Sequence, residues 1–154
     1  MKPPRYDDEL APLTSDSLIE SRIAALIGRA SRRQVWFLFV DEAARQLPIL
    51  LPIDDHPARP DPDDAARFAA LLREMGETTD AVGTIIVIER YADATLTASD
   101  VAWAKTLHTA TGLASFGLCG ILVSHSRGVR WVAPDDYLFE GDGDGASDDQ
   151  AEAV

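Results

Sequence analysis

Three apolar runs of strand length constrain the fold of this 154-residue chain more than any other feature. They are QVWFLFVD at residues 34–41, AVGTIIVIE at 81–89 and GLCGILVSH at 117–125. Because polar residues do not alternate with the apolar ones in these runs, each strand is expected to be buried on both faces of a sheet. Helices must then cover both sides of that sheet, which predicts a three-layer α/β/α domain.

The segments before and between these runs carry helix signals. Residues 14–31 show helical spacing of apolar side chains, and Ser17 followed by Glu20 fits a capping box. A second helix is predicted to begin with Asp61 as its cap, and Gly76 can end it. These helices would supply the outer layers of the domain.

Two further segments are predicted strands. QLPILLPID at 46–54 contains Pro48 and Pro52, which offer no N–H to a neighbour, so this strand is expected to lie at an edge or to be irregular. VRWVA at 129–133 follows the turn SRG and forms a short last strand. Strands joined by short turns would be antiparallel, whereas the two joined by a helix would be parallel. The expected fold class is α/β, with a mixed central sheet of about five strands.

The formal net charge of −12 is unevenly distributed along the chain. Residues 140–154 hold six acids and no base, and we expect them to form a disordered acidic tail. Residues 1–13 contain three prolines and are expected to be a flexible lead-in, which leaves 14–139 as the folded domain. An acidic body disfavours nucleic acid as a partner, because duplex binding depends on Lys and Arg.

Cysteine content and hydropathy argue against disulfides, cysteine zinc sites and membrane segments. Cys119 is the only cysteine, so an internal disulfide and a multi-cysteine zinc site are both excluded. It lies inside an apolar run and is expected to be an inert core residue. No apolar run approaches the ~20 residues of a membrane span, and the N-terminus lacks the apolar core of a signal peptide. We expect a cytoplasmic protein.

The stretch TIIVIERYADATLTASD, from Thr84 to Asp100, passes from a strand through a polar loop to a helix start. Thr97 and Asp100 have the spacing of a reciprocal helix cap, which accounts for both residues without a ligand. The same helix start could bind a small anion, with Arg90 adding positive charge. His125 ends another strand, which is a favoured position for lining a pocket.

From residue 34 to about Tyr137, the order of elements resembles the JAB/MPN (JAMM) fold, and within it the RadC-like bacterial branch. In that family a strand ends in a His-x-His-Pro motif, a loop follows, and Ser-x-x-Asp opens a helix. The helix leads to a strand ending in Asp-His and then to a short strand with an aromatic residue near its end. Here GTIIVIERYADATLTASD and GLCGILVSHSRGVRW follow the same plan.

Active members of the resembled family hydrolyse isopeptide or peptide bonds with zinc, which two His and one Asp hold. Carried over by position, the two His fall on Glu89 and Tyr91, whereas Thr97 matches the Ser position and Asp100 the third ligand. A phenol is a poor zinc ligand at neutral pH because its pKa is ~10. The resemblance therefore implies that the metal site is lost, and no cofactor is expected.

At the later Asp-His pair of the family, Ser124 replaces the Asp and His125 is retained. The resemblance then implies a non-catalytic member that serves as a protein–protein interaction or scaffold module, as a homodimer or with another protein. Its ligand or partner pocket would be lined by Glu89, Arg90, Tyr91, Thr97, Ser99, Asp100, Ser124 and His125.

Two other functions use the same residues. A hydrolase could have a rearranged site of Glu89, Asp100 and His125, with or without a metal, and it requires these side chains to converge in one cleft. A small-anion or nucleotide sensor would instead be centred on Arg90 and the helix start at Thr97.

Overall fold

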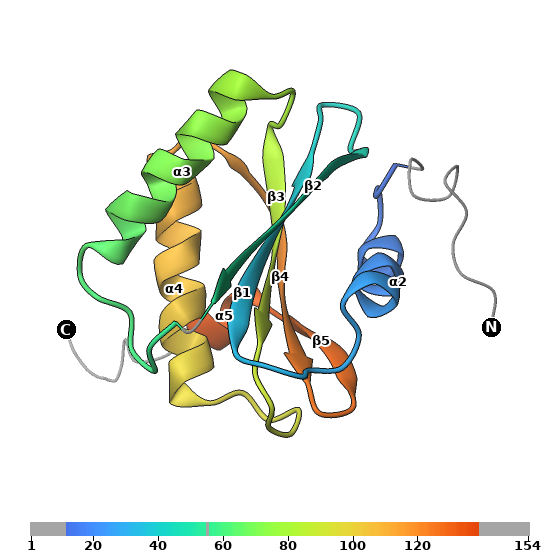
Figure 1. Cartoon of the computed structure of the whole chain (residues 1–154), viewed down its shortest axis with the longest axis vertical. Coiled ribbons are helices and arrows are strands. Elements are labelled where there is room, and N and C mark those ends of the chain that lie inside the picture. Colours follow the sequence, from blue (N-terminus) through green and yellow to red (C-terminus); the bar gives the residue numbers. More distant parts are fainter. Residues whose placement is uncertain (1–11, 55, 139–154) are drawn as a thin grey trace.

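Five strands form the centre of the computed structural model, which describes residues 12–54 and 56–138 (Figure 1). They lie in the spatial order β2-β1-β3-β4-β5. The strands are β1 (Gln34–Val40), β2 (Gln46–Asp54), β3 (Gly83–Glu89), β4 (Gly117–His125) and β5 (Gly128–Val132). The helices are α2 (Asp16–Leu26), α3 (Asp64–Thr78), α4 (Ala98–Leu113) and the short α5 (Pro134–Tyr137).

Helices cover both faces of the sheet, as the apolar runs predicted. Figure 1 shows α3 and α4 on one side of the sheet and α2 on the other. β3 and β4 are parallel, whereas β1 pairs antiparallel with both β2 and β3, and β4 pairs antiparallel with β5. The structure is therefore a single three-layer α/β/α domain with a mixed five-stranded sheet.

The side chains of β3 divide between two apolar layers. All seven residues of this strand are buried. Ile86 and Ile88 belong to the core on the side of α3 and α4, which includes Trp103. Ile85 and Val87 belong to the core on the side of α2. Because successive strand residues point to opposite faces, the same alternation decides which way the polar residues at the strand end point.

β2 is an edge strand, as its prolines predicted. Pro48 and Pro52 are both exposed, and Pro52 pairs in register with Trp36 of β1. A proline has no N–H to donate to a neighbouring strand. At the edge of a sheet one side of the strand has no neighbouring strand, so the missing N–H leaves no carbonyl of another strand unpaired. The predicted hairpin around SRG is also present, with His125 opposite Gly128.

The predicted cap of the first helix is wrong. The hydroxyl of Ser15, not that of Ser17, accepts the N–H of Leu18 at 3.2 Å, and the helix begins two residues earlier than expected. Ser15 has the extended backbone that lets a cap side chain reach a free amide, whereas Ser17 is already helical. Ser17 and Glu20 therefore do not form a capping box.

The predicted ends of the second helix are also wrong. α3 begins at Asp64, whose carboxylate accepts the N–H of Asp61 at 2.7 Å, so the expected cap residue lies in a turn before the helix. Gly76 does not end the helix. The helix continues to Thr78 and ends at Thr79, whose hydroxyl donates to the carbonyl of Met75 at 2.6 Å.

Cys119 is exposed, which contradicts the prediction of a core cysteine. β5 pairs with β4 only from Ile121 onward, so no described strand pairs with the first half of β4 on its outer side. The Cys119 sulfur nevertheless lies close to Gly83 of β3: a Cβ built on this glycine would be 3.3 Å from the sulfur. This local burial raises the pKa of the Cys119 thiol.

Both predicted terminal segments lie outside the described residues, apart from residues 12 and 13 of the lead-in. Leu13 is buried, and its N–H donates to the carbonyl of Ala44 at 2.8 Å. Within the described part of the chain, no helix combines the length and the apolar character needed to cross a membrane.

Gly120 of β4 lies directly beneath the ring of Trp131 on β5. A Cβ at this position would be 2.2 Å from the ring. We expect Gly120→Ala to destabilise the domain by about 1–3 kcal/mol, because the ring must move out of its packing. Urea unfolding followed by tryptophan fluorescence measures the change.

Gly112→Ala is the matched control, since no atom of the described residues, apart from the backbone of α4 itself, lies within 4 Å of a Cβ at that position. It should leave stability unchanged or raise it by up to ~1 kcal/mol. Equal unfolding midpoints for the two variants would contradict the packing of Trp131 over Gly120.

Candidate functional site

The predicted site residues gather where β3 and β4 end and α4 begins, at the lower end of Figure 1. β3 ends at Glu89, and its parallel neighbour β4 ends at His125. The carboxyl ends of parallel strands are the usual binding edge of an open α/β sheet. Here the side chains at this edge fall into two groups, one on each face of the sheet.

The Glu89 carboxylate, at the end of β3, accepts hydrogen bonds from the segment between α2 and β1 and from β1 itself. One oxygen accepts the backbone N–H groups of Ser31 at 2.7 Å and Arg32 at 3.2 Å. The other accepts the side chains of Gln34 at 2.8 Å and Trp36 at 2.9 Å. Glu89 is 3% exposed, so these donors take the place of water around the charge.

Two opposing effects act on the pKa of Glu89. Burial raises the pKa, but the hydrogen bonds from Ser31, Gln34, Trp36 and Arg32 outweigh it, and the pKa falls below its usual 4.5. Glu89 is therefore ionised at neutral pH. A carboxylate in this state, with both oxygens already bonded, is a structural anchor and a poor general acid.

Arg90 and Asp100 form a buried ion pair on the other face of the sheet. Arg90 Nε donates to both carboxylate oxygens at 3.1 Å, and Nη2 donates to one of them at 3.0 Å. The two residues are 5% and 2% exposed. The guanidinium also donates to the carbonyls of Ala92 at 3.3 Å, Asp93 at 2.8 Å and Thr95 at 2.9 Å. It thereby fixes the loop after β3.

α4 starts with the reciprocal cap that the sequence predicted. Asp100 N–H donates to the Thr97 hydroxyl at 3.0 Å, and Thr97 N–H donates to the Asp100 carboxylate at 2.9 Å. The Ser99 hydroxyl accepts Arg33 Nη2 at 3.2 Å. One carboxylate therefore serves both the helix cap and Arg90, and it supplies the negative charge that the start of a helix favours.

Ser124 and Tyr91 have contrasting environments. Ser124 is fully buried opposite Glu89 in the parallel register, and its hydroxyl donates to the carbonyl of Gly28 at 2.6 Å. It therefore belongs to the α2 side of the sheet with Glu89. Tyr91 is 76% exposed at the beginning of the loop.

His125 is 8% exposed, and its Nδ1 accepts the backbone N–H of Arg127 at 3.2 Å. Burial, followed by the positive charges of Arg90 and Arg130, lowers the pKa of His125 below its usual 6.5, although Asp93 opposes this shift. The imidazole is therefore neutral at pH 7, and the bond at Nδ1 assigns its proton to Nε2.

The structure does not bring Glu89 and Asp100 together. Arg90 continues the strand geometry, because its N–H still bonds to the Ser124 carbonyl at 3.1 Å. Neighbouring residues of a strand point to opposite faces, so Glu89 lies on the α2 side while Arg90 and Asp100 lie on the α4 side. With Tyr91 in solvent, the positions that match the family's zinc ligands do not fit a shared metal ion. Across residues 12–54 and 56–138, no three His, Cys, Asp or Glu side chains form a group that could hold one.

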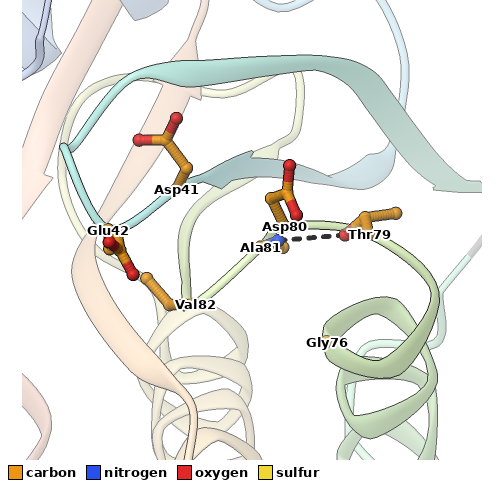
Figure 2. A pocket seen from close by; sticks show the side chains of 7 residues that line it. All are labelled: Asp41, Glu42, Gly76, Thr79, Asp80, Ala81 and Val82. Carbon is orange, nitrogen blue, oxygen red and sulfur yellow. Dashed lines mark hydrogen bonds between the residues drawn. The ribbon is translucent and has the colours of Figure 1, made fainter.

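A cavity of about 470 Å³ lies at the opposite end of the sheet, where β1 ends and β3 begins. Figure 2 shows that its three carboxylates, from Asp41, Glu42 and Asp80, do not converge on a common point. Asp41 instead accepts two backbone N–H groups of its own turn, at 2.9 and 3.0 Å. The remaining lining residues are Gly76, Thr79, Ala81 and Val82.

Several residues of the site come from segments that the sequence alone did not connect with it. Ser31, Gln34 and Trp36 bind a carboxylate that lies 53–58 positions later in the chain. Arg33 binds Ser99 across 66 positions. The sequence feature that could have indicated these contacts is the polar Gln34 at the start of an otherwise apolar strand. It becomes informative only once β1 is known to pair antiparallel with β3, which places Gln34 opposite Glu89.

Removing one partner of the buried ion pair should destabilise the domain strongly. Asp100→Asn keeps the shape of the side chain but leaves the Arg90 cation unpaired, and we expect a loss of about 3–5 kcal/mol. Urea unfolding measures the loss. Asp80→Asn, at an exposed position, is the control and should change stability by less than ~0.5 kcal/mol. Similar midpoints for the two variants would show that the pair does not support the fold.

The lowered pKa of Glu89 makes its contribution depend on pH. A carboxylate whose folded pKa lies below its unfolded value stabilises the fold above the unfolded pKa, and this stabilisation is lost as the pH falls through the folded pKa. Glu89→Gln should therefore be most destabilising above pH ~5, and its effect should shrink as the pH falls below the usual glutamate pKa of ~4.3. Urea unfolding of both proteins across this range is the measurement. A difference that stays constant would be inconsistent with an ionised, hydrogen-bonded Glu89.

The contacts at this edge hold the neighbouring loops together and leave Tyr91 exposed. A search with models of known protein families and a search among curated protein sequences both gave no match.

Proposed function

We propose that this chain is a degenerate, non-catalytic member of the RadC-like JAB/MPN family that acts as a protein–protein interaction module. Two features support the family. A helix with the Thr97/Asp100 start joins β3 to the parallel β4, and a short strand with Trp131 follows. The partner would be another protein or a second copy of this chain. The single cysteine fits the cytoplasm, where disulfides are rare.

One observation carries the proposal. The polar groups at the positions of the family's active site are bonded within the domain, whereas Tyr91 extends into solvent. Glu89 holds the segment before β1, and Asp100 holds both Arg90 and the start of α4. Residues used in this way maintain a surface, and Tyr91 is 76% exposed on it.

The contacts of Arg90 prepare Tyr91 for binding. Three carbonyls of the loop after Tyr91 accept hydrogen bonds from Arg90, so the loop is held in one conformation. A preorganised loop loses less conformational entropy when a partner binds. Tyrosine is also among the residues that contribute most at the centre of protein interfaces. We therefore place the binding surface around Tyr91.

A comparison of two exposed apolar side chains tests this proposal. Tyr91→Ala removes the side chain at the predicted surface, and Leu113→Ala removes one that is 51% exposed at the far end of α4. Partners captured by cross-linking in host cells are identified first, and their affinities for the purified proteins are then measured. Self-association is measured by light scattering.

We expect Tyr91→Ala to lower the affinity for the partner, or for a second copy of the chain, at least ~tenfold. Leu113→Ala should have little effect on either affinity. Circular dichroism confirms that both variants fold. A partner that binds both variants as tightly as the unchanged chain would place the interface elsewhere and refute the role of Tyr91.

A further inference from the structure

A group of arginines surrounds the ends of β3 and β4, and we call it the arginine end. Among the residues that the structure describes, the ion pairs are Arg67–Asp64 and Arg90–Asp100. None of the arginines in the group takes part in either. The arginine end consists of Arg29, Arg32, Arg33, Arg127 and Arg130, of which Arg29, Arg32 and Arg127 are exposed.

Hydrogen bonds between distant segments bring these arginines to the same end of the sheet. The N–H of Ala30 donates to the His125 carbonyl at 2.7 Å, and that of Arg32 donates to the Glu89 carboxylate at 3.2 Å. The segment that carries Arg29 and Arg32 therefore crosses the ends of both strands. From the other side, the Arg130 side chain donates to a carbonyl of the loop after β3 at 3.0 Å.

The carboxylates at this end do not balance the arginines. Glu89 is buried among N–H donors, and Asp100 is paired with Arg90. Among the described residues, Asp54, which pairs in register with Gln34, and Asp93 in the loop are exposed acids at this end. Within residues 12–54 and 56–138, five arginines thus lie at an end of the sheet that has two exposed aspartates, in a protein whose formal net charge is −12.

The C-terminal segment of the chain has the complementary charge. Residues 140–154 contain six acids and neither Lys nor Arg. The described chain ends at Leu138, just after α5, whose Tyr137 contacts His108 of α4. Sixteen residues of extended chain can span about 50 Å, whereas the 16-residue α4 is about 24 Å long. Length therefore does not prevent the segment from reaching the end of the domain where α4 begins.

We propose that residues 140–154 dock on the arginine end. Tethering gives the segment an effective concentration in the millimolar range, so weak charge pairing suffices. The acidic remainder of the protein repels the segment and leaves the arginine end as its favoured position. This contact lies within one chain and needs no partner, so it goes beyond the interaction function.

Paramagnetic relaxation enhancement tests the contact in the full chain. A spin label is attached through Gln150→Cys in a chain that also carries Cys119→Ser, because Cys119 is exposed. We expect the amide signals of Arg32, Tyr91 and Arg127 to broaden at low salt. At about 0.5 M salt, where screening acts within a few ångströms, the broadening should largely disappear.

Charge reversal provides the matched comparison. Arg32→Glu with Arg127→Glu should reduce the broadening several-fold, whereas Arg45→Glu, an exposed residue at the opposite end of the sheet, should not. Even broadening over the whole domain, or broadening centred on Trp131 and the free half of β4, would overturn the proposal. So would equal broadening between labelled and unlabelled chains in a mixture, which would assign the contact to a second copy. The Tyr91 binding comparison is a separate result and stands whatever the outcome.

Discussion

The buried ion pair between Arg90 and Asp100 is the interaction on which this end of the domain depends. Burying two charges is unfavourable unless each donor and acceptor finds a partner. Arg90 meets that requirement by bonding to the Asp100 carboxylate and to three carbonyls of the loop that follows β3. Asp100 meets it by also accepting the N–H of Thr97. The ion pair therefore sets the course of the loop, the start of α4 and the exposed position of Tyr91.

The alternation of side chains along β3 separates the carboxylates of the predicted site. Glu89 and Arg90 are adjacent in sequence, yet they anchor different layers of the domain. Glu89 binds the segment that connects α2 with β1, and Arg90 binds the helix on the other face. A metal or acid–base site needs side chains that converge on one point. Here the strand geometry sends the two carboxylates of the predicted site to opposite sides of the sheet.

The sequence predicted the layers better than the site. Apolar runs identified the strands because full burial demands continuous apolar sequence, and Pro48 identified the edge because it cannot donate. The cap at Thr97 was predictable because its partners lie three residues apart. Cys119 was placed wrongly because the length of β5, which leaves the first half of β4 open, is not visible in β4 itself. The donors around Glu89, such as Ser31, lie more than 50 positions away and become neighbours only through the β1–β3 pairing.

Metal analysis of the purified full chain tests the central claim, that the residues at the family's zinc positions hold the fold together. Zinc content is measured by mass spectrometry after growth with added zinc, and the melting temperature is measured with zinc and with a chelator. The account predicts far less than one zinc per chain and a melting temperature that neither addition changes, since a ligand that binds the folded state would raise it. One zinc per chain, retained in Asp80→Asn but lost from a folded variant of Glu89 or Asp100, would contradict it.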